Sequence, residues 1–267
     1  MNKSELLAFL HEIGARPQKR LSQNFLIDNN ILAKIIALAD VHRDERILEV
    51  GPGPGALTQK LLAAGARVTA VEKDACFAKH LLRLQTEDLR LEVFSDDFLK
   101  WDIPVLLPPW KVVANLPYNI TTPILEKLCQ DRRVVSSLTI MVQKEVADRI
   151  RAKPGTKAFG SLTLFLQFYC DCTGAFPVSA SSFYPEPKVS STVLRLDLKK
   201  PPDVDPEAFF FMIHKAYQQR RKMVAVSLRS YFPGIKESLE ALSLSAKVRP
   251  EELSLEQWIA LYRIRSG

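Results

Sequence analysis

The sequence predicts an α/β fold in which helices cover both faces of a mostly parallel sheet, followed by a small all-α domain. Two observations favour this class. Short apolar runs alternate with helical patterns from residue 46 to residue 142, as parallel strands joined by crossover helices require. After the double proline at 201–202, every periodic segment is helical. We therefore expect a first domain over 1–200 and a helical domain over 201–267.

Composition narrows the class of protein. The chain has 267 residues, of which 47% are hydrophobic and 25% charged, as in ordinary globular proteins. No apolar stretch approaches the roughly 18–20 residues that span a bilayer. The first residues mix acids with apolar side chains, unlike a secretory signal, and four scattered cysteines are too few for a disulfide framework or a zinc site. We expect a cytoplasmic protein without a metal, and its net charge of +7 favours a polyanionic partner such as nucleic acid.

The expected elements follow in chain order. Ser4 is a plausible N-cap for a short helix ending at Ile13, a basic loop covers 14–20, and Asp28 can cap a helix over 29–39. The predicted strands are 46–50, 66–71, 91–94, 111–114, 138–142, 163–169 and 192–198, with a helix over 56–64 after the first strand. Only Ser, Pro and Gly material separates the late strands, which suggests an antiparallel addition at one edge. Helices are expected over 206–212, 215–231, 235–242 and 254–263.

The first strand runs into a glycine turn, Gly51-Pro52-Gly53-Pro54-Gly55. Glycines permit a sharp turn and close approach of a ligand to the backbone. The two prolines remove N–H groups that a pyrophosphate would need, which argues against a dinucleotide. Glu49 completes the pattern E-x-G-x-G-x-G, which is typical of methyltransferases that use S-adenosylmethionine (SAM). Since SAM carries an amine and a sulfonium, acidic neighbours are tolerable.

Two further acids follow strands. Glu72 ends the second strand, where a carboxylate can accept hydrogen bonds from ribose hydroxyls; NAD and SAM sites share this feature. Asp97 follows the third strand and could accept the amino protons of an adenine ring. Either Asp96 or Asp97 could instead cap a helix.

The most specific motif is Asn115-Leu116-Pro117-Tyr118, after the fourth strand. An exocyclic base amine is a poor nucleophile because its lone pair is delocalised into the ring. The side-chain oxygen of Asn115 and the backbone carbonyl of Leu116 could each accept one amino proton and direct the lone pair at the SAM methyl. Pro117 would hold that carbonyl in place, and Tyr118 would offer a ring face for the base.

These motifs together resemble the ribosomal RNA adenine N6,N6-dimethyltransferases of the KsgA type, over nearly the whole chain. The matching segments are Gln23 to Leu26, Gly51 to Thr58, Glu72, Asp97, Asn115 to Ile120, Phe183 to Val189 and Gln219 to Lys222. The last of them matches a basic C-terminal helix of the family. The resemblance implies a Rossmann-like class I SAM-dependent methyltransferase sheet. Ser22 and Ser190 depart from the family pattern, where Gly and Asp are usual.

The resemblance also implies roles and a substrate. Asn24 and Leu26 would contact SAM together with Gly51, Gly53, Glu72, Asp97 and Asn115. Phe183 would pack on the target adenine opposite Tyr118, although from the residues alone it could be an ordinary core residue. The substrate would be two adjacent adenines in a hairpin loop near the 3′ end of 16S-type small-subunit ribosomal RNA, each methylated twice in the assembling subunit.

Basic side chains near these motifs are candidates for RNA backbone contacts. They are Lys19, Arg20, Lys188, Arg220, Arg221 and Lys222, although each alone could be a solvated surface residue. Two alternatives remain: an adenine N6-methyltransferase acting on 23S ribosomal RNA, as in macrolide resistance, and a non-catalytic assembly or transcription factor on the same fold. A dinucleotide oxidoreductase would leave the Asn115–Tyr118 motif unexplained.

Overall fold

The structure is a computed structural model that describes residues 1–87, 90–104, 109–131, 134–219 and 221–266, without the side chains of 19, 86, 87 and 266. The chain divides into two compact units. Unit 1 comprises Met1–Ala147 and Cys172–Leu198, and unit 2 comprises Asp148–Asp171 and Lys199–Gly267. This division differs from the expected domains in residues 148–171 and 199–200, which the sequence placed with the sheet.

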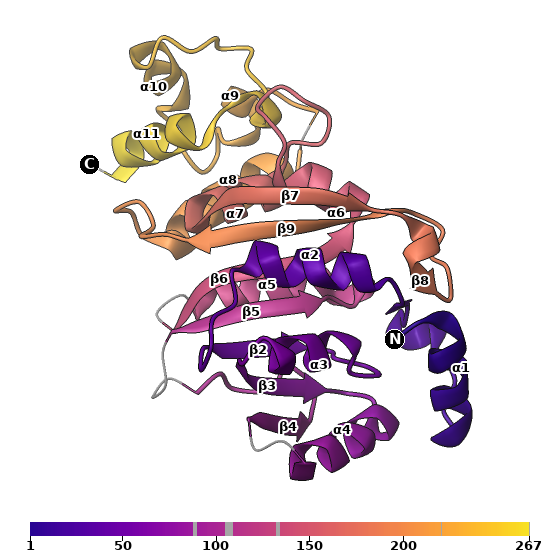
Figure 1. Cartoon of the computed structure of the whole chain (residues 1–267). Coiled ribbons are helices and arrows are strands. Elements are labelled where there is room, and N and C mark those ends of the chain that lie inside the picture. Colours follow the sequence, from indigo (N-terminus) through magenta and orange to yellow (C-terminus); the bar gives the residue numbers. More distant parts are fainter. Residues whose placement is uncertain (88–89, 105–108, 132–133, 220, 267) are drawn as a thin grey trace. The chain divides into compact units, whose positions relative to one another are not determined.

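Within the described residues, unit 1 is built around a sheet with strand order β4-β3-β2-β5-β6-β9-β7 (Figure 1). Its strands are β2 (Arg46–Val50), β3 (Arg67–Glu72), β4 (Leu91–Ser95), β5 (Trp110–Asn115), β6 (Val135–Gln143), β7 (Cys170–Val178) and β9 (Ser191–Leu198). The first five strands of this order pair in parallel, whereas β9 is antiparallel to β6. The predicted α/β class and the antiparallel addition are confirmed.

The directions of the crossover connections indicate where a ligand would bind. Helix α3 (Ala56–Ala63) joins β2 to β3, and α5 (Thr121–Gln130) joins β5 to β6. These connections step in opposite directions along the sheet, so right-handed crossovers put the two helices on opposite faces, with α3 in front and α5 behind in Figure 1. The order reverses between β2 and β5, which makes the carboxyl ends of these strands the expected ligand site.

The N-terminal helices begin at side-chain caps. The remaining helices of unit 1 are α1 (Lys3–Glu12), α2 (Asn29–Ala39) and α4 (Ala75–Glu87). Asp28 caps α2 as predicted and accepts two backbone N–H groups at 2.9 and 3.3 Å. The predicted cap of α1, Ser4, is wrong. Asn2 takes that place because its side chain accepts the Glu5 N–H (2.9 Å) while the Glu5 carboxylate accepts the Asn2 N–H (2.8 Å), a reciprocal capping box.

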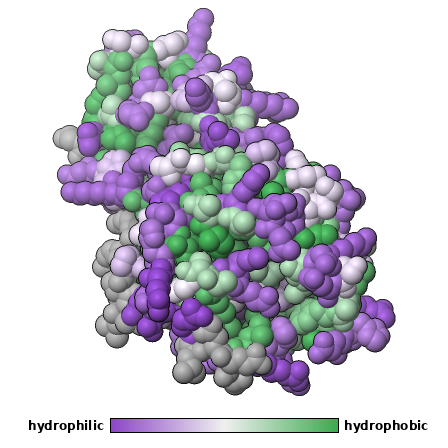
Figure 2. Space-filling view, viewed as in Figure 1, coloured by the Kyte–Doolittle hydropathy of each residue, from purple (hydrophilic) through white to green (hydrophobic). Residues whose placement is uncertain are grey.

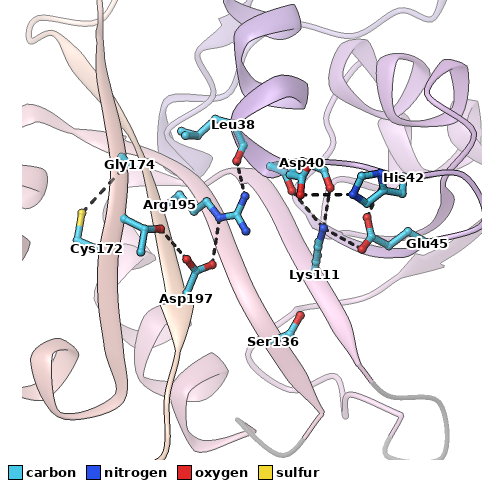
Figure 3. Close-up of polar contacts among 12 residues, drawn as sticks. Leu38, Asp40, His42, Glu45, Lys111, Ser136, Cys172, Gly174, Arg195 and Asp197 are labelled. Atoms are coloured by element: carbon cyan, nitrogen blue, oxygen red, sulfur yellow. Dashed lines mark hydrogen bonds and ion pairs between the residues drawn. The ribbon is translucent and has the colours of Figure 1, made fainter.

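Two basic side chains hold the C-terminal end of α2 against the sheet (Figure 3). Lys111 of β5 donates to the Asp40 carbonyl oxygen (2.6 Å) and pairs with Glu45 (2.8 Å). Arg195 of β9 donates to the Leu38 carbonyl oxygen (2.9 Å). Because the last carbonyls of a helix lack partners within the helix, these donors satisfy them and fix the position of α2.

The segment 163–169, predicted as a strand, belongs to helix α7 (Ser161–Tyr169). The prediction was wrong because a short apolar run has no period that separates a buried strand from a buried helix. The strand follows as β7, in which Gly174 and Pro177 resemble turn residues. Since β7 ends the strand order, it is an edge strand, and edge strands tolerate proline.

Unit 2 is helical within the described residues. Besides α7 and the end of α6 (Lys144–Ile150), it contains α8 (Pro206–Tyr217), α9 (Val224–Ser227), α10 (Ile235–Ala241) and α11 (Leu255–Ser266). The ring of Phe168 in α7 stacks on that of Phe209 in α8 at 5.3 Å, and Phe165 contacts Phe210 at 5.3 Å. These aromatic pairs explain why 148–171 belongs to unit 2: helix α7 buries its rings against α8.

The predicted helix over 215–231 is wrong. Helix α8 ends at Tyr217 and α9 begins at Val224, with a turn in which the Lys222 N–H donates to the Gln219 carbonyl oxygen (2.7 Å). Gln219, Arg221 and Lys222 offer no apolar side chain to the core of the unit, and helices in proteins depend mainly on packing of an apolar face. Gln219, Arg221 and Lys222 therefore lie outside a helix, and Arg220 is not among the described residues.

The surface mixes polar and apolar side chains. On the face shown in Figure 2, hydrophilic residues surround smaller hydrophobic patches. Large exposed hydrophobic residues include Leu7, Leu82, Phe211 and Val226. Among the residues that the structure describes, no helix combines the length and apolar character needed to cross a bilayer.

Candidate active site

A cavity of ≈ 200 Å³ lies in unit 1, where β2, β3 and β5 end. Ten of the eleven predicted cofactor-binding and catalytic residues line it: Asn24, Leu26, Gly51, Gly53, Glu72, Asp97, Asn115, Leu116, Pro117 and Tyr118. Parallel pairing brings the residues that follow β2, β3 and β5 together, because the carboxyl ends of neighbouring parallel strands meet at one edge of a sheet. Asn24 and Leu26 come instead from the segment before α2.

The glycine turn packs closely against its neighbours. Gly51 and Gly53 have φ angles of +68° and +55°, which residues with side chains rarely adopt. A Cβ at Gly53 would lie 3.2 Å from the Phe25 ring, and one at Gly51 would lie 3.6 Å from Pro117 Cγ. The turn and the Asn115–Tyr118 segment are therefore direct neighbours, as the predicted chemistry requires.

The backbone of this turn has no N–H group to offer a phosphate. Pro52 and Pro54 have none. The three glycine N–H groups donate, in chain order, to the Val71 carbonyl oxygen (2.9 Å), to Glu72 Oε2 (2.8 Å) and to the Pro52 carbonyl oxygen (3.0 Å). A pyrophosphate cradle made of backbone N–H groups is thus excluded at this turn.

Two buried carboxyl groups line the cavity. Glu72 is 6% exposed and accepts the N–H groups of Gly53 and Asp74, the latter at 2.7 Å; burial raises its pKa, and these hydrogen bonds oppose the rise. Burial raises the pKa of Glu49 to about 8, opposed by a hydrogen bond from the Thr58 hydroxyl (2.7 Å) and reinforced by the charge of Glu72. A site with these acids suits a cationic ligand.

Asp97 lines the cavity with both carboxylate oxygens engaged. Lys73 Nζ lies 2.8 Å from Oδ2, and the Leu99 N–H donates to Oδ1 (3.0 Å). The Lys73 hydrogen bond lowers the pKa of Asp97, so the group is ionised at neutral pH. Asp96 Oδ1 accepts the Asp97 N–H (2.6 Å), so both acids cap local backbone. A carboxylate has further lone pairs, which leaves Asp97 able to accept from a ligand.

Asn115 supplies a buried acceptor without a partner. Its Nδ2 donates to the Asn24 carbonyl oxygen (3.2 Å), which fixes the orientation of the amide. Its Oδ1 is buried and has no hydrogen-bond partner among the residues that the structure describes. A buried acceptor left unpaired costs about 1–3 kcal/mol, so such an atom calls for a donor from a ligand.

The rest of the motif is anchored to two strands. The Leu116 N–H donates to the Met141 carbonyl oxygen of β6 (3.2 Å). The Tyr118 hydroxyl forms a hydrogen bond with Ser191 Oγ at the start of β9 (2.7 Å). Burial raises the pKa of Tyr118, so the side chain stays a neutral phenol. Anchors on both sides hold the motif rigidly, which favours alignment of a reacting group.

Phe183 is not among the residues that line the cavity. This residue is 3% exposed, belongs to strand β8 (Phe183–Tyr184), and pairs with Leu26 of β1 (Phe25–Leu26) within the hydrophobic core. Of the two readings that the sequence left open, the geometry favours an ordinary core residue, because a ring that is already buried offers no free face to a base. Stacking of Phe183 on an adenine stays a prediction.

The predicted RNA-binding residues fall in both units. Arg20 and Lys188 of unit 1 are exposed, as are Arg221 and Lys222 in the turn between α8 and α9. The side chain of Lys19 and the whole of Arg220 lie outside the described residues. Unit 2 holds 16 Lys and Arg against 10 Asp and Glu, whereas unit 1 holds 21 against 20, so most of the net charge lies in unit 2.

Sequence reasoning missed one polar cluster at the cavity. Asp74, 6% exposed, accepts hydrogen bonds from the side chains of Gln18 (2.8 Å) and Gln23 (2.9 Å). The only local signal is an acid placed to cap the helix after Glu72. Within the described residues, no group of three His, Cys, Asp or Glu side chains could hold a metal ion.

Known proteins resemble this chain over nearly its whole length. The sequence matches the ribosomal RNA adenine dimethylase family over residues 14–265. It is 46% identical to ribosomal RNA small subunit methyltransferase A of Protochlamydia amoebophila, over 97% of this chain and 95% of the relative. The protein of the same name from Chlamydia muridarum is 42% identical, over 97% and 96%.

Two solved structures share the fold. A dimethyladenosine transferase from Plasmodium falciparum has a TM-score of 0.78 and 25% identity, over 89% of this chain and 95% of that one. The 23S rRNA methyltransferase ErmE has a TM-score of 0.71 and 26% identity, over 91% and 100%. With ten predicted residues gathered around one cavity, and with a family match from residue 14 to residue 265, the chain belongs to the ribosomal RNA adenine dimethylase family.

Proposed function

We propose that this protein transfers methyl groups from SAM to the N6 amines of two adjacent adenines in a hairpin loop near the 3′ end of small-subunit ribosomal RNA. Each adenine receives two methyl groups while the subunit is assembled. The observation that carries the chemistry is the buried, unpartnered Oδ1 of Asn115 in the cavity wall. A cytoplasmic location follows from this substrate.

The cavity suits SAM better than a dinucleotide. Glu72 would bind the ribose hydroxyls, Asp97 the adenine amine, and the turn at Gly51 and Gly53 would allow close approach of the ligand. Asn24 and Leu26 would complete the cofactor site, as the family resemblance implies. The buried acids and the occupied N–H groups of the turn fit a cationic ligand and not a pyrophosphate. SAM supplies the electrophilic methyl group.

The residues of the Asn115–Tyr118 motif would activate the amine by alignment. Asn115 Oδ1 would accept a hydrogen bond from one amino proton and the Leu116 carbonyl oxygen would accept one from the other, so that the nitrogen moves towards tetrahedral geometry and its lone pair points at the SAM methyl. The ring face of Tyr118 would hold the base by stacking. The methylated amine is cationic and acidic enough to release its proton to water, so no strong general base is required.

The target adenine must be unstacked from the RNA to reach the cavity, at a cost of a few kcal/mol. Contacts with the RNA backbone must offset this cost. The exposed side chains proposed for this role are Arg20, Lys188, Arg221 and Lys222, with Lys19 and Arg220 beside them in the sequence. The basic surplus of unit 2 supports a share of RNA binding by that unit.

The 23S rRNA alternative shares the fold and the chemistry. The relatives named for the small subunit are 42–46% identical to this chain, whereas the 23S rRNA methyltransferase ErmE is 26% identical. This difference favours the small subunit. The alternative of a non-catalytic factor is disfavoured because Glu72, Asn115 and Tyr118 all line the cavity.

The direct test uses two parallel reactions. The protein is incubated with radiolabelled SAM and either unmethylated small subunits or 23S ribosomal RNA, and the nucleosides of each RNA are then analysed. We expect N6,N6-dimethyladenosine in the small-subunit RNA alone. Label in 23S RNA alone would establish the alternative substrate, and no label in either RNA would contradict the proposed activity.

A further inference from the structure

The buried side chain of Asp74 contacts the loop 18–24, which forms part of the cavity wall. Residues 20–24 of this loop line the cavity. The Oδ2 atom of Asp74 accepts hydrogen bonds from Gln18 Nε2 (2.8 Å) and Gln23 Nε2 (2.9 Å), at the two ends of this loop. Its Oδ1 accepts the Cys76 N–H (3.0 Å) at the start of α4. The mechanism proposed above uses neither Asp74 nor the two glutamines.

The two glutamine amides are fixed in orientation by contacts on their other side. Gln23 Oε1 accepts a hydrogen bond from the backbone N–H of Gln18 (2.8 Å), and Gln18 Oε1 accepts one from Arg20 Nε (2.8 Å). Turning either amide would place two donors against each other. Both glutamines therefore present N–H groups to position 74, and this position must be an acceptor.

The loop also adopts a strained conformation. Ser22 has a φ of +52°, in the left-handed region that favours glycine. Such a residue persists only where surrounding contacts determine its conformation. The hydrogen bonds of Gln18 and Gln23 to Asp74 bracket Ser22 and supply these contacts.

The loop leads directly to the Asn115 amide. Its last residue, Asn24, accepts the hydrogen bond from Asn115 Nδ2 (3.2 Å) through its carbonyl oxygen. The Asn24 side chain donates back to the Ser22 carbonyl oxygen (3.1 Å). A shift of Ser22 would therefore also shift Asn24. The Asn24 carbonyl decides which end of the Asn115 amide is left as an acceptor.

We propose that Asp74 is a positioning residue for methyl transfer: it holds the loop 18–24 through Gln18 and Gln23, so that the Asn24 carbonyl keeps Asn115 Oδ1 available to the substrate amine. The inference rests on the proposed function.

A reciprocal exchange of donor and acceptor tests the proposal. Asp74→Asn puts an NH₂ group against the two glutamine NH₂ groups, while asparagine still caps α4 through its oxygen. Gln23→Glu puts a carboxylate against Asp74. In the double variant, the carboxylate introduced at position 23 can accept from both the amide introduced at position 74 and the Gln18 N–H, which restores one of the two bonds. Gln59→Glu, at an exposed position of α3, is the matched control.

We expect each single variant to lower kcat at saturating SAM and RNA by at least about tenfold, because small misplacements of reacting groups cost up to about 10²-fold. The double variant, in which one of the two bonds is restored, should lose less kcat than either single variant, and Gln59→Glu should match wild type. A double variant that loses the product of the two single losses would overturn the proposal, as would single variants with unchanged kcat.

Hydrogen exchange without cofactor gives a second readout that needs no activity. Backbone amides of residues 18–26 should exchange faster in each single variant and return toward the wild-type rate in the double variant. Unchanged exchange in the single variants would show that Asp74 does not hold the loop. Wild-type protein that is inactive on small subunits would refute the proposed function instead, and the exchange rates would still decide whether Asp74 holds the loop.

Discussion

Replacing Asn115 by alanine should strongly lower the activity while leaving the stability of the protein nearly unchanged. The side chain makes one hydrogen bond, from Nδ2 to the Asn24 carbonyl oxygen, and leaves Oδ1 buried without a partner among the described residues. The substitution therefore removes one favourable contact and one unfavourable burial at the same time. In the reaction, by contrast, it removes one of the two acceptors that would align the substrate amine.

The magnitudes differ for the two properties. Loss of the Asn24 hydrogen bond costs about 0.5–1.5 kcal/mol, whereas removal of the unpaired acceptor relieves about 1–3 kcal/mol. The lost packing of the side chain offsets part of that relief, so we expect the free energy of unfolding to change by less than about 1 kcal/mol. Loss of one aligned hydrogen-bond partner in an active site costs about 10²–10³ in kcat, or about 2.7–4 kcal/mol of barrier.

The assay combines methyl transfer to unmethylated small subunits with thermal unfolding and SAM calorimetry. Asn115→Ala should lose transfer by at least about a hundredfold, unfold near the wild-type temperature and retain part of its SAM affinity. Asn30→Ala, on the exposed surface of α2, is the matched control and should behave as wild type. Full turnover by Asn115→Ala would refute the alignment role. A large drop in unfolding temperature would refute the reasoning on the unpaired oxygen.

Other predictions test the cofactor site, the RNA contacts and Phe183. Glu72→Ala should weaken SAM binding in calorimetry; an unchanged affinity would contradict the ribose assignment. The pKa of Glu49 is raised to about 8, and a cation favours its ionised form, so SAM affinity should rise with pH between about 6.5 and 8 and then level off. Glu49→Gln should abolish this rise, and a rise that persists would assign it to another group. Arg221→Ala with Lys222→Ala should weaken RNA binding and reduce the slope of log affinity against log salt by about 1–2; an unchanged slope would place both side chains off the RNA. Phe183→Ala should destabilise the protein by about 3–5 kcal/mol in denaturant titrations, because the ring is buried, whereas Phe183→Leu should keep most stability and transfer. A stable but inactive leucine variant would show that the ring stacks on the base.

Local patterns in the sequence were enough to predict the end of the sheet at which the cavity lies. The strand 46–50 was predicted with the bounds that β2 has, and β5 extends the predicted 111–114 by one residue at each end. A buried strand followed by glycines is a strong local signal, and its parallel neighbours bring Glu72 and Asn115 to the same edge. The positions of Asn24 and Leu26 came from the family resemblance, since a short loop before a helix carries no periodic signal of its own.

Non-local contacts could not be predicted in the same way. Gln18 and Asp74 are 56 residues apart, and neither belongs to a recognisable motif. The membership of 148–171 in unit 2 depends on ring contacts between α7 and α8, and periodicity within α7 cannot reveal them. Features that depend on side chains from distant segments require the fold itself.

The ionisable side chains that line the cavity favour a mechanism in which the substrate amine is aligned over one in which a general base removes its proton. None of the four histidines lines the cavity in the described part of the chain. Among the carboxyl groups that line the cavity, Glu49 accepts a hydrogen bond from Thr58 and Glu72 accepts two backbone N–H groups. In the proposed mechanism the methylated amine releases its proton to water, so these carboxyl groups need not act as general bases. Since Asn115 cannot take up a proton at neutral pH, its neutral amide oxygen can only accept a hydrogen bond. If Asn115 aligns the amine as proposed, the rate of the chemical step depends on how rigidly Asn115 is held, and variants that disturb the contacts of Asn24 or Asp74 should slow methyl transfer.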